Sequence, residues 1–222
     1  MTSASPLIHI FDMDYTLIEN DCDVSWKEFC VAEKLAPESD IQEADRFYQL
    51  YLEGKLDFNE FTRFQFREFT GNSPETMYAL TRSHFEKYVK SKVRPQALNY
   101  VKELLAQGKR CVILTSTNEV IARPVAEYFG ISEVYGSQIE LVNGAFTGNL
   151  TGVYTAGEGK AVIARELEKS SGVPLELFAA YGDSINDLPL LKCVGFPHAV
   201  SPGKSLLEEA QKLDFTILNW SI

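Results

Sequence analysis

The sequence predicts an α/β protein in which a parallel sheet carries helices on both faces and a helical segment is inserted near the N-terminus. Short apolar runs of strand length alternate with helical patterns over most of the chain. Three of these runs end directly in polar residues, near positions 12, 115 and 183. Between residues 19 and 91 the strand pattern stops and helical spacing replaces it. Alternation of strands and helices favours a parallel sheet covered on both sides.

The first predicted strand, residues 7–11, ends in two aspartates. Because the run is mostly apolar, Asp12 and Asp14 should lie just beyond its carboxyl end. Ligands bind at that edge of parallel α/β sheets. Two carboxylates with the backbone between them form a hard-oxygen cluster that suits Mg²⁺. Taken alone, the same pattern is also typical of a strand followed by a polar turn.

Residues 19–91 have the pattern of a small helical domain, which leaves residues 1–18 and 92–222 for the α/β core. Gly54 marks a turn within the helical segment. An aromatic stripe near residues 58–69 is more often helix–helix core than a ligand site. Helices are expected near residues 23–34, 41–52, 59–69 and 73–90.

From residue 93 the α/β alternation resumes. Pro95 and Gly108 bracket a helix in the usual Pro-first, Gly-last arrangement. Asn143-Gly144 is a strong hairpin signal between two short strands, residues 138–142 and 145–150. Further strands are expected near residues 110–114, 134–135, 177–181, 194–200 and 215–218, and further helices near 118–129, 159–171 and 204–213.

Composition excludes several classes of protein. A formal net charge of −10 argues against non-specific nucleic-acid binding, although a metal and a few local cations could still hold a phosphate. No apolar run approaches the length of a membrane span, and residues 1–6 lack the basic start of a signal peptide. The four scattered cysteines indicate reduced thiols, so a cytoplasmic location is expected. The sequence does not indicate the oligomeric state.

Four motifs together resemble those of the haloacid dehalogenase (HAD) superfamily of aspartate-nucleophile phosphatases. Their order and spacing cover nearly the whole chain. The chain is most similar to the phosphoserine-phosphatase-like subgroup, subfamily IB, in which a helical cap follows the first motif. The resemblance thus implies a Rossmann-like core with a cap at residues 19–91. The motifs are Asp12-Met13-Asp14-Tyr15-Thr16, Thr115 after an apolar strand, Lys160, and Gly182-Asp183-Ser184-Ile185-Asn186-Asp187.

The resemblance implies a Mg²⁺-dependent phosphomonoesterase with two working aspartates. Asp12 would attack phosphorus and form an aspartyl-phosphate. Asp14 would protonate the leaving alcohol and then accept a proton from the hydrolytic water. The metal would be held by the Asp12 carboxylate, the Asp14 backbone carbonyl and Asp183, with Asp187 as an indirect partner. Asp187 could also be a partner of the lysine, and the plain alternative is a helix N-cap.

Three further residues would hold the phosphoryl group, according to the same resemblance. Thr115 and Lys160 would bind its oxygens, and Asn186 would reach the phosphate. Two of them have a simpler interpretation from the residues alone. Thr115 could merely cap the following helix, and Lys160 could be a solvated helix lysine.

Specificity is expected to reside in the cap, where the chain departs from phosphoserine phosphatases. Asp21 matches the position at which those enzymes bind the substrate amine, nine residues after the nucleophile. Alignment of residues 53–58 places Gln65 at their carboxylate-binding arginine, and glutamine cannot supply that charge. Asp21 and Asp23 therefore suggest a small phosphomonoester with a cationic group, unless they only cap the first cap helix. Phosphoserine, histidinol phosphate, phosphoethanolamine and phosphocholine are candidates.

Other functions are less consistent with the motifs. A dehalogenase would not need the general acid Asp14, and a phosphotransfer ATPase of the superfamily would need membrane spans. Mutase activity is disfavoured by the position of the cap. The non-enzymatic alternative is a metal-binding or partner-binding module on the same fold. Such a module would be expected to lack Asp12, Asp14 or Lys160, and all three are present in the sequence.

Overall fold

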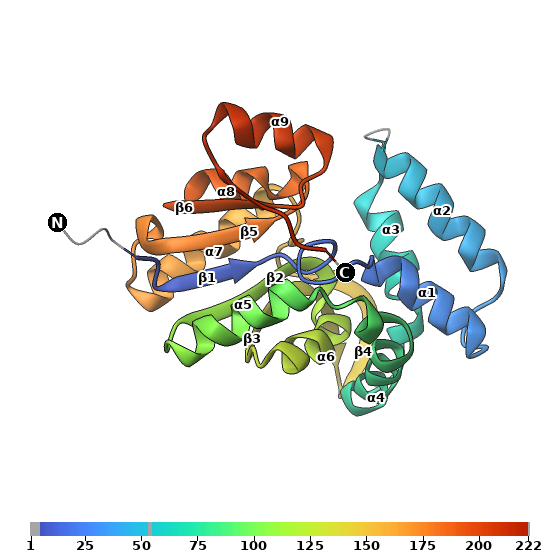
Figure 1. The fold of residues 1–222 in the computed structure, drawn as a ribbon. Helices are drawn as coiled ribbons and strands as arrows, with labels where there is room; N and C mark the ends of the chain where they lie inside the picture. Colours follow the sequence, from blue (N-terminus) through green and yellow to red (C-terminus); the bar gives the residue numbers. More distant parts are fainter. Residues whose placement is uncertain (1–4, 53–54, 222) are drawn as a thin grey trace.

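The computed structural model describes residues 5–52 and 55–221. Its strands are β1 (Ile8–Phe11), β2 (Arg110–Asn118), β3 (Glu133–Val142), β4 (Ala145–Thr151), β5 (Phe178–Gly182), β6 (Phe196–Val200) and β7 (Thr216–Leu218). Within the described ranges they form one seven-stranded sheet in the order β4-β3-β2-β1-β5-β6-β7 (Figure 1). Neighbouring strands are parallel except in the β3–β4 hairpin. The predicted α/β class with a Rossmann-like sheet is confirmed.

The strand β1 lies at the centre of the sheet, between β2 and β5. All four of its residues are buried, as its apolar run predicts. Ile8 lies opposite Arg110 of β2 and Phe178 of β5 in the two parallel pairings. Neighbouring parallel strands end at the same edge of the sheet. Asp12, which follows β1, and Asp183, which follows β5, therefore lie next to each other at that edge.

The strand β2 is longer than predicted. It was expected to end at Leu114, but it continues to Asn118. Its pairing with β3 becomes irregular after Leu114 and resumes where Asn118 lies opposite Ser137. Thr115 therefore lies inside the strand and is fully buried, rather than in a loop beyond the sheet.

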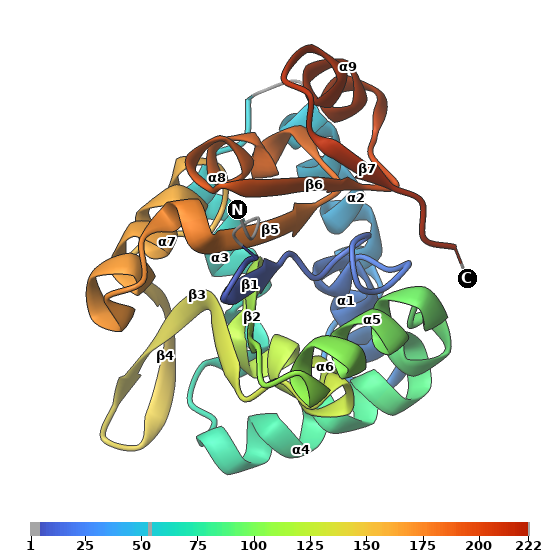
Figure 2. The same cartoon turned by 60° about the vertical axis from the view of Figure 1, so that its left-hand side comes forward.

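Helices cover both faces of the sheet (Figure 2). They are α5 (Pro95–Ala106), α6 (Glu119–Phe129), α7 (Glu158–Ser171), α8 (Leu188–Cys193) and α9 (Lys204–Lys212). Phe11 packs in a core with side chains of α5 and α6, whereas Ile10 packs in a second core with side chains of α7, α8 and α9. Successive strand residues point to opposite faces, which explains the two cores. The short helix α8 was not predicted.

The inserted segment is helical, as expected. Its helices are α1 (Cys22–Ala32), α2 (Ser39–Leu52), α3 (Phe58–Gln65) and α4 (Pro74–His84), with short helical turns at Arg67–Phe69, Phe85–Val89 and Lys90–Lys92. The helices α1, α2 and α3, called the cap helices below, stand beyond the carboxyl ends of the central strands (Figure 1). The helix α4 packs against α6 instead, where Tyr78 donates a hydrogen bond to Glu127, and in the following turn the Phe85 ring lies 5.5 Å from that of Tyr128. The turn expected at Gly54 and the first four residues of the N-terminus lie outside the described residues.

The two chain segments that enter and leave the insertion are paired with each other. Ile18 and Val93 form an antiparallel bridge. The Glu19 amide donates to the Lys92 carbonyl at 2.8 Å, and the Arg94 amide donates to the Leu17 carbonyl at 3.1 Å. This pairing brings residues 17–19 and 92–94 together at the end of β1, so the cap helices begin close to Asp12.

Two expectations from composition concern membranes and thiols. None of the helices in the described ranges combines the length and apolar content needed to cross a bilayer. The four cysteines are free, and all but Cys193 are buried.

Candidate active site

A cavity of about 560 Å³ lies between the carboxyl edge of the sheet and the cap helices. Core and cap both contribute to its wall, so residues distant in sequence face one space. The predicted site residues that line it are Asp12, Asp14, Asp21, Asp23, Gln65, Lys160, Asp183 and Asn186. Thr115 and Asp187 do not line it, since both are fully buried behind the wall.

Lys160, near the start of α7, joins two of the predicted aspartates. Its Nζ donates to Asp12 Oδ1 and to Asp187 Oδ1, both at 2.5 Å. Burial opposes the charge on Lys160, but the two carboxylates outweigh burial and raise its pKa. Lys160 is therefore a buried cation, and the solvated alternative does not hold.

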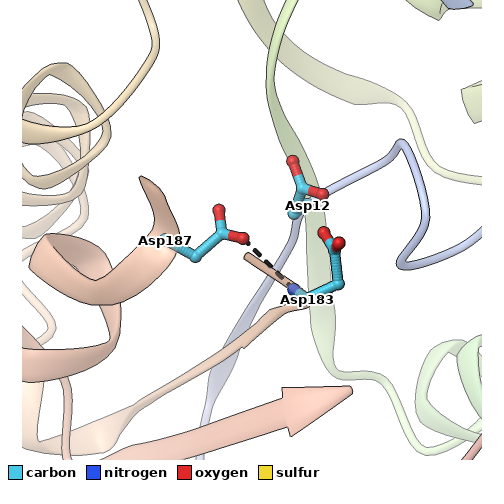
Figure 3. Close-up of side chains that lie close together, drawn as sticks. All are labelled: Asp12, Asp183 and Asp187. Carbon is cyan, nitrogen blue, oxygen red and sulfur yellow. Dashed lines mark hydrogen bonds between the residues drawn. The ribbon is translucent and has the colours of Figure 1, made fainter. Parts of the chain in front are cut away.

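Asp12, Asp183 and Asp187 form a cluster of carboxylates (Figure 3). One oxygen of each lies within 4.8 Å of the others. Burial, together with the neighbouring acids, raises the pKa of Asp183 to about 9, and burial raises that of Asp12 to about 6 against the opposing effect of Lys160. Burial and mutual repulsion thus disfavour the ionised form of these carboxylates. Together they form an oxygen-only donor set that fits a hard divalent cation such as Mg²⁺.

Asp187 differs from the other two because both of its oxygens are already engaged within the protein. Oδ1 accepts from Lys160, and Oδ2 accepts from the backbone amides of Asp183 at 3.2 Å and Ser184 at 3.1 Å. Gly182 permits this fold of the loop, since a Cβ there would lie 2.5 Å from the Asp187 side chain. Asp187 therefore organises the loop after β5 and positions Lys160.

Asp14 stands apart from the carboxylate cluster. Its Oδ1 accepts from the Cys22 backbone amide at 2.9 Å, and its Oδ2 accepts from the Thr117 hydroxyl at 2.8 Å. Burial, and then the nearby charges of Asp21 and Asp12, hold its pKa well above the ordinary range. A carboxyl group that keeps its proton near neutral pH is suited to act as a general acid.

The hydroxyl residues at the end of β2 are arranged differently from the prediction. Thr115 Oγ1 accepts from the Thr117 amide at 3.2 Å, and its carbonyl accepts from Thr155 at 2.6 Å. The cavity is lined instead by the neighbouring Ser116, and Thr117 contacts Asp14. Sequence reasoning singled out only Thr115, although the Thr-Ser-Thr run was the available signal for its two neighbours.

Two cap acids face the same cavity. Asp21 is the N-cap of α1, because its Oδ1 accepts from the amides of Asp23 and Val24 at 3.0 Å each. Both Asp21 and Asp23 also line the cavity, so Asp21 caps α1 and contributes to the cavity wall at the same time. Burial and the charge of Asp21 raise the pKa of Asp23 to about 7, opposed by Lys27 and by a hydrogen bond from Gln65.

Similarity to known proteins agrees with this geometry. Residues 10–192 match the family model of the haloacid dehalogenase-like hydrolases. The chain is 33% identical to a histidinol-phosphatase of Neisseria meningitidis, covering 95% of this chain and 97% of that protein. It is 27% identical to the phosphoserine phosphatase SerB1 of Mycobacterium tuberculosis, covering 96% of this chain and 70% of that protein.

Solved structures of this fold are similar over the whole chain. A protein of unknown function from Bordetella pertussis Tohama I superposes with a TM-score of 0.88 at 27% identity, covering 96% of this chain and 98% of that one. A substrate-bound phosphoserine phosphatase has the same fold, with a TM-score of 0.70 at 20% identity and coverage of 96% and 93%. The chain belongs to the haloacid dehalogenase-like hydrolases, and within that family it is a phosphatase, a phosphoric monoester hydrolase.

Proposed function

We propose that this protein hydrolyses a small, nitrogen-bearing phosphomonoester through an aspartyl-phosphate on Asp12, with Mg²⁺ as cofactor. The observation that carries the proposal is the double hydrogen bond of Lys160 to Asp12 and Asp187 beside the cavity. It supports Asp12 as the nucleophile, because this carboxylate lies next to a fixed positive charge where a phosphate dianion could be bound and attacked.

In the first step an oxygen of Asp12 forms a bond to phosphorus while the bond from phosphorus to the ester oxygen breaks. Asp14 gives its proton to the departing oxygen, which leaves as an alcohol. An alkoxide is a poor leaving group, so a protonated acid at this point lowers the barrier. The raised pKa of Asp14 supports its being protonated at this stage.

In the second step water attacks the phosphorus of the aspartyl-phosphate. Asp14, now a carboxylate, accepts a proton from that water, and the bond between phosphorus and the Asp12 oxygen breaks. Inorganic phosphate leaves, and both aspartates return to their starting states. Lys160 stays beside the phosphoryl group throughout and offsets its negative charge.

The metal would be held by Asp12 and Asp183, with the Asp14 backbone carbonyl as a third ligand and Asp187 as an indirect partner. The clustered carboxylate oxygens and the raised pKa values of Asp12 and Asp183 support this assignment. When bound, Mg²⁺ would offset the repulsion between Asp12 and the phosphate dianion.

Phosphate contacts are proposed for Lys160, Asn186 and the turn at Thr115. Lys160 and Asn186 line the cavity, and so does Ser116 beside Thr115. The Thr115 hydroxyl bonds the Thr117 amide in this structure, so its proposed contribution includes holding that turn.

Residues 19–91 are proposed to act as a cap over the core formed by residues 1–18 and 92–222. The cavity wall has contributions from both parts, which supports this division. A cap that closes over bound substrate excludes water and bulky esters. Small metabolites are therefore favoured over phosphoproteins.

The substrate is proposed to carry an amine, with histidinol phosphate preferred over phosphoserine. Asp21 and Asp23 line the cavity, and Lys160 is the only basic residue among the described residues that do so. A substrate amine would find counter-charges there, whereas a carboxylate would have to share Lys160 with the phosphate. The relative named histidinol-phosphatase supports the same choice.

The test is release of inorganic phosphate from a panel of esters with and without Mg²⁺. The panel contains histidinol phosphate, phosphoserine, phosphoethanolamine, phosphocholine and a neutral sugar phosphate, with Asp12→Asn as the blank. Metal-dependent turnover that vanishes in the blank is expected, with histidinol phosphate as the best ester. Absence of turnover with every ester, by a protein that binds Mg²⁺, would instead favour a binding module. Equal turnover of cationic and neutral esters would exclude the proposed amine recognition.

A further inference from the structure

The half of the cavity formed by the cap helices is largely aromatic. Phe47 of α2 and Phe58, Phe61 and Phe64 of α3 line it, and these four residues are called the aromatic wall. The Phe47 ring lies 5.6 Å from that of Phe61 and 5.1 Å from that of Phe64. An apolar surface opposite a charged floor suits a ligand with a phosphate at one end and an apolar body at the other.

Gln65, the last residue of α3, interrupts this apolar surface with an unused acceptor. Its side chain lines the cavity and the residue is only 5% exposed. Its Oε1 is buried without a hydrogen-bond partner. Most buried polar atoms in proteins have a partner, and an unpaired one costs roughly 1–3 kcal/mol. An N–H group of a ligand could supply the missing donor.

The groups around Gln65 make the region attractive to a cation. The Gln65 side chain donates to Asp23, which together with Asp21 places negative charge on the cavity wall. The nearby cation Lys27 is already engaged by the Phe64 carbonyl at 2.6 Å and by Glu68 at 2.5 Å. A ligand carboxylate would be repelled by Asp21 and Asp23 here. A protonated nitrogen would instead be attracted by these acids and could donate a hydrogen bond to Gln65 Oε1.

Building on the proposed function, we infer that the cap half of the cavity is a subsite for a protonated, planar nitrogen ring of the substrate. Gln65 Oε1 accepts a hydrogen bond from a ring N–H, Asp23 supplies the counter-charge, and the aromatic wall packs against the ring face. Gln65 is then a specificity-determining residue. An amine without a ring would leave the aromatic wall uncovered, and a carboxylate would find no donor beside Gln65.

The test compares Gln65→Met, which keeps the length of the side chain and removes both its acceptor and its donor to Asp23, with Gln65→Glu, which removes that donor and keeps an acceptor. Gln211→Leu, at an exposed position of α9, is the matched control. KM and kcat are measured with histidinol phosphate and with p-nitrophenyl phosphate, an aromatic ester without an N–H group. Loss of one hydrogen bond to a charged group predicts a rise of about tenfold in KM for histidinol phosphate in Gln65→Met, with kcat changed by less than about twofold. Gln211→Leu should match the wild type with both esters. Gln65→Glu should lose less affinity for histidinol phosphate than Gln65→Met, and in Gln65→Met the rise in KM should be smaller for p-nitrophenyl phosphate than for histidinol phosphate.

A second measurement uses only the wild-type protein, so it does not depend on the folding of a variant. Histidinol should inhibit competitively at a concentration about tenfold or more below that needed for ethanolamine, because only histidinol carries the ring. Equal inhibition by the two amines, or an unchanged KM for histidinol phosphate in Gln65→Met, would overturn the subsite while leaving the phosphatase proposal intact. Failure of the wild type to hydrolyse histidinol phosphate and every other ester of the panel would instead contradict the proposed function itself.

Discussion

Lys160 holds Asp12 and Asp187 at 2.5 Å each, so a single buried ammonium group links the end of β1 to the loop after β5. The three residues come from distant parts of the chain, and 148 positions separate Asp12 from Lys160. This contact keeps the proposed nucleophile fixed before any ligand arrives. It also balances part of the negative charge that the carboxylate cluster gathers at the sheet edge.

Asp12→Asn should abolish phosphate release and leave the protein folded. The nucleophile is lost, so activity should fall by about 10³-fold or more. Burial already disfavours the Asp12 carboxylate, and Lys160 keeps Asp187 as a partner, so the free energy of unfolding should not decrease. Phosphate release and urea unfolding measure the two effects. A variant with substantial residual turnover would argue against covalent catalysis at Asp12.

Lys160→Met should destabilise the protein, and Mg²⁺ should restore part of the loss. Without Lys160 the buried carboxylates of the cluster lack their cation, at a cost of about 3 kcal/mol. A divalent ion would replace part of the missing charge. Urea unfolding with and without Mg²⁺ tests this, with the exposed Lys192→Met as control. A variant that Mg²⁺ stabilises no more than the wild type would contradict metal binding at this cluster.

Mg²⁺ affinity should increase with pH. The ion competes with protons for Asp183, whose pKa burial and neighbouring acids raise to about 9, and for Asp12, whose pKa burial raises to about 6. Below these values protons are bound and must be displaced, so the apparent affinity should rise by up to about tenfold per pH unit while one proton is released. Calorimetric titration at about pH 6.5 and about pH 8 measures this. An affinity that does not change with pH would show that these carboxyls are already ionised.

Thr117→Val should impair hydrolysis in a way that depends on the leaving group. The variant removes the hydroxyl that donates to Asp14 Oδ2, so the general acid loses an orienting contact. For an alkyl phosphate kcat/KM, which reports on transfer of the phosphoryl group to Asp12, should fall by about tenfold, since proton transfer to the leaving group is part of bond breaking. For p-nitrophenyl phosphate, whose leaving group needs no acid, kcat/KM should stay nearly constant. Thr117→Ser serves as the control that keeps the donor, and an equal loss with both esters would point to a structural role.

His84→Gln should flatten the dependence of stability on pH below about pH 6.5. His84 is buried and its Nε2 bonds Ser25 at 2.9 Å, and burial lowers its pKa from 6.5 to about 4. Between these values the unfolded chain binds a proton that the folded chain does not, so stability falls as the pH falls, by up to about 3 kcal/mol. Urea unfolding of both proteins between about pH 7 and about pH 4.5 compares the slopes. Identical slopes would show that His84 is not the group that titrates.

The sequence by itself determined the sheet and the position of the acidic residues at its edge. Apolar runs of strand length predicted β1 and β5, and the carboxyl ends of parallel strands lie at one edge of a sheet. The sequence therefore placed Asp12 and Asp183 at the same edge, and the observed strand order, with β1 beside β5, brings them next to each other. Lys160 was predicted from the spacing of the family motifs, and its contact with Asp12 depends on how α7 packs against the sheet.

Only the tertiary structure decided how the cap and the end of β2 are arranged. The continuation of β2 to Asn118 is set by pairing with β3, and it buries Thr115 while Ser116 faces the cavity. The packing of α4 on α6, rather than with the cap helices alone, likewise depends on contacts between residues far apart in the chain. Helical periodicity shows that Phe61 and Phe64 share a face, but it does not show what that face covers. The unpaired oxygen of Gln65 is a property of its surroundings, and those surroundings exist only once the chain has folded.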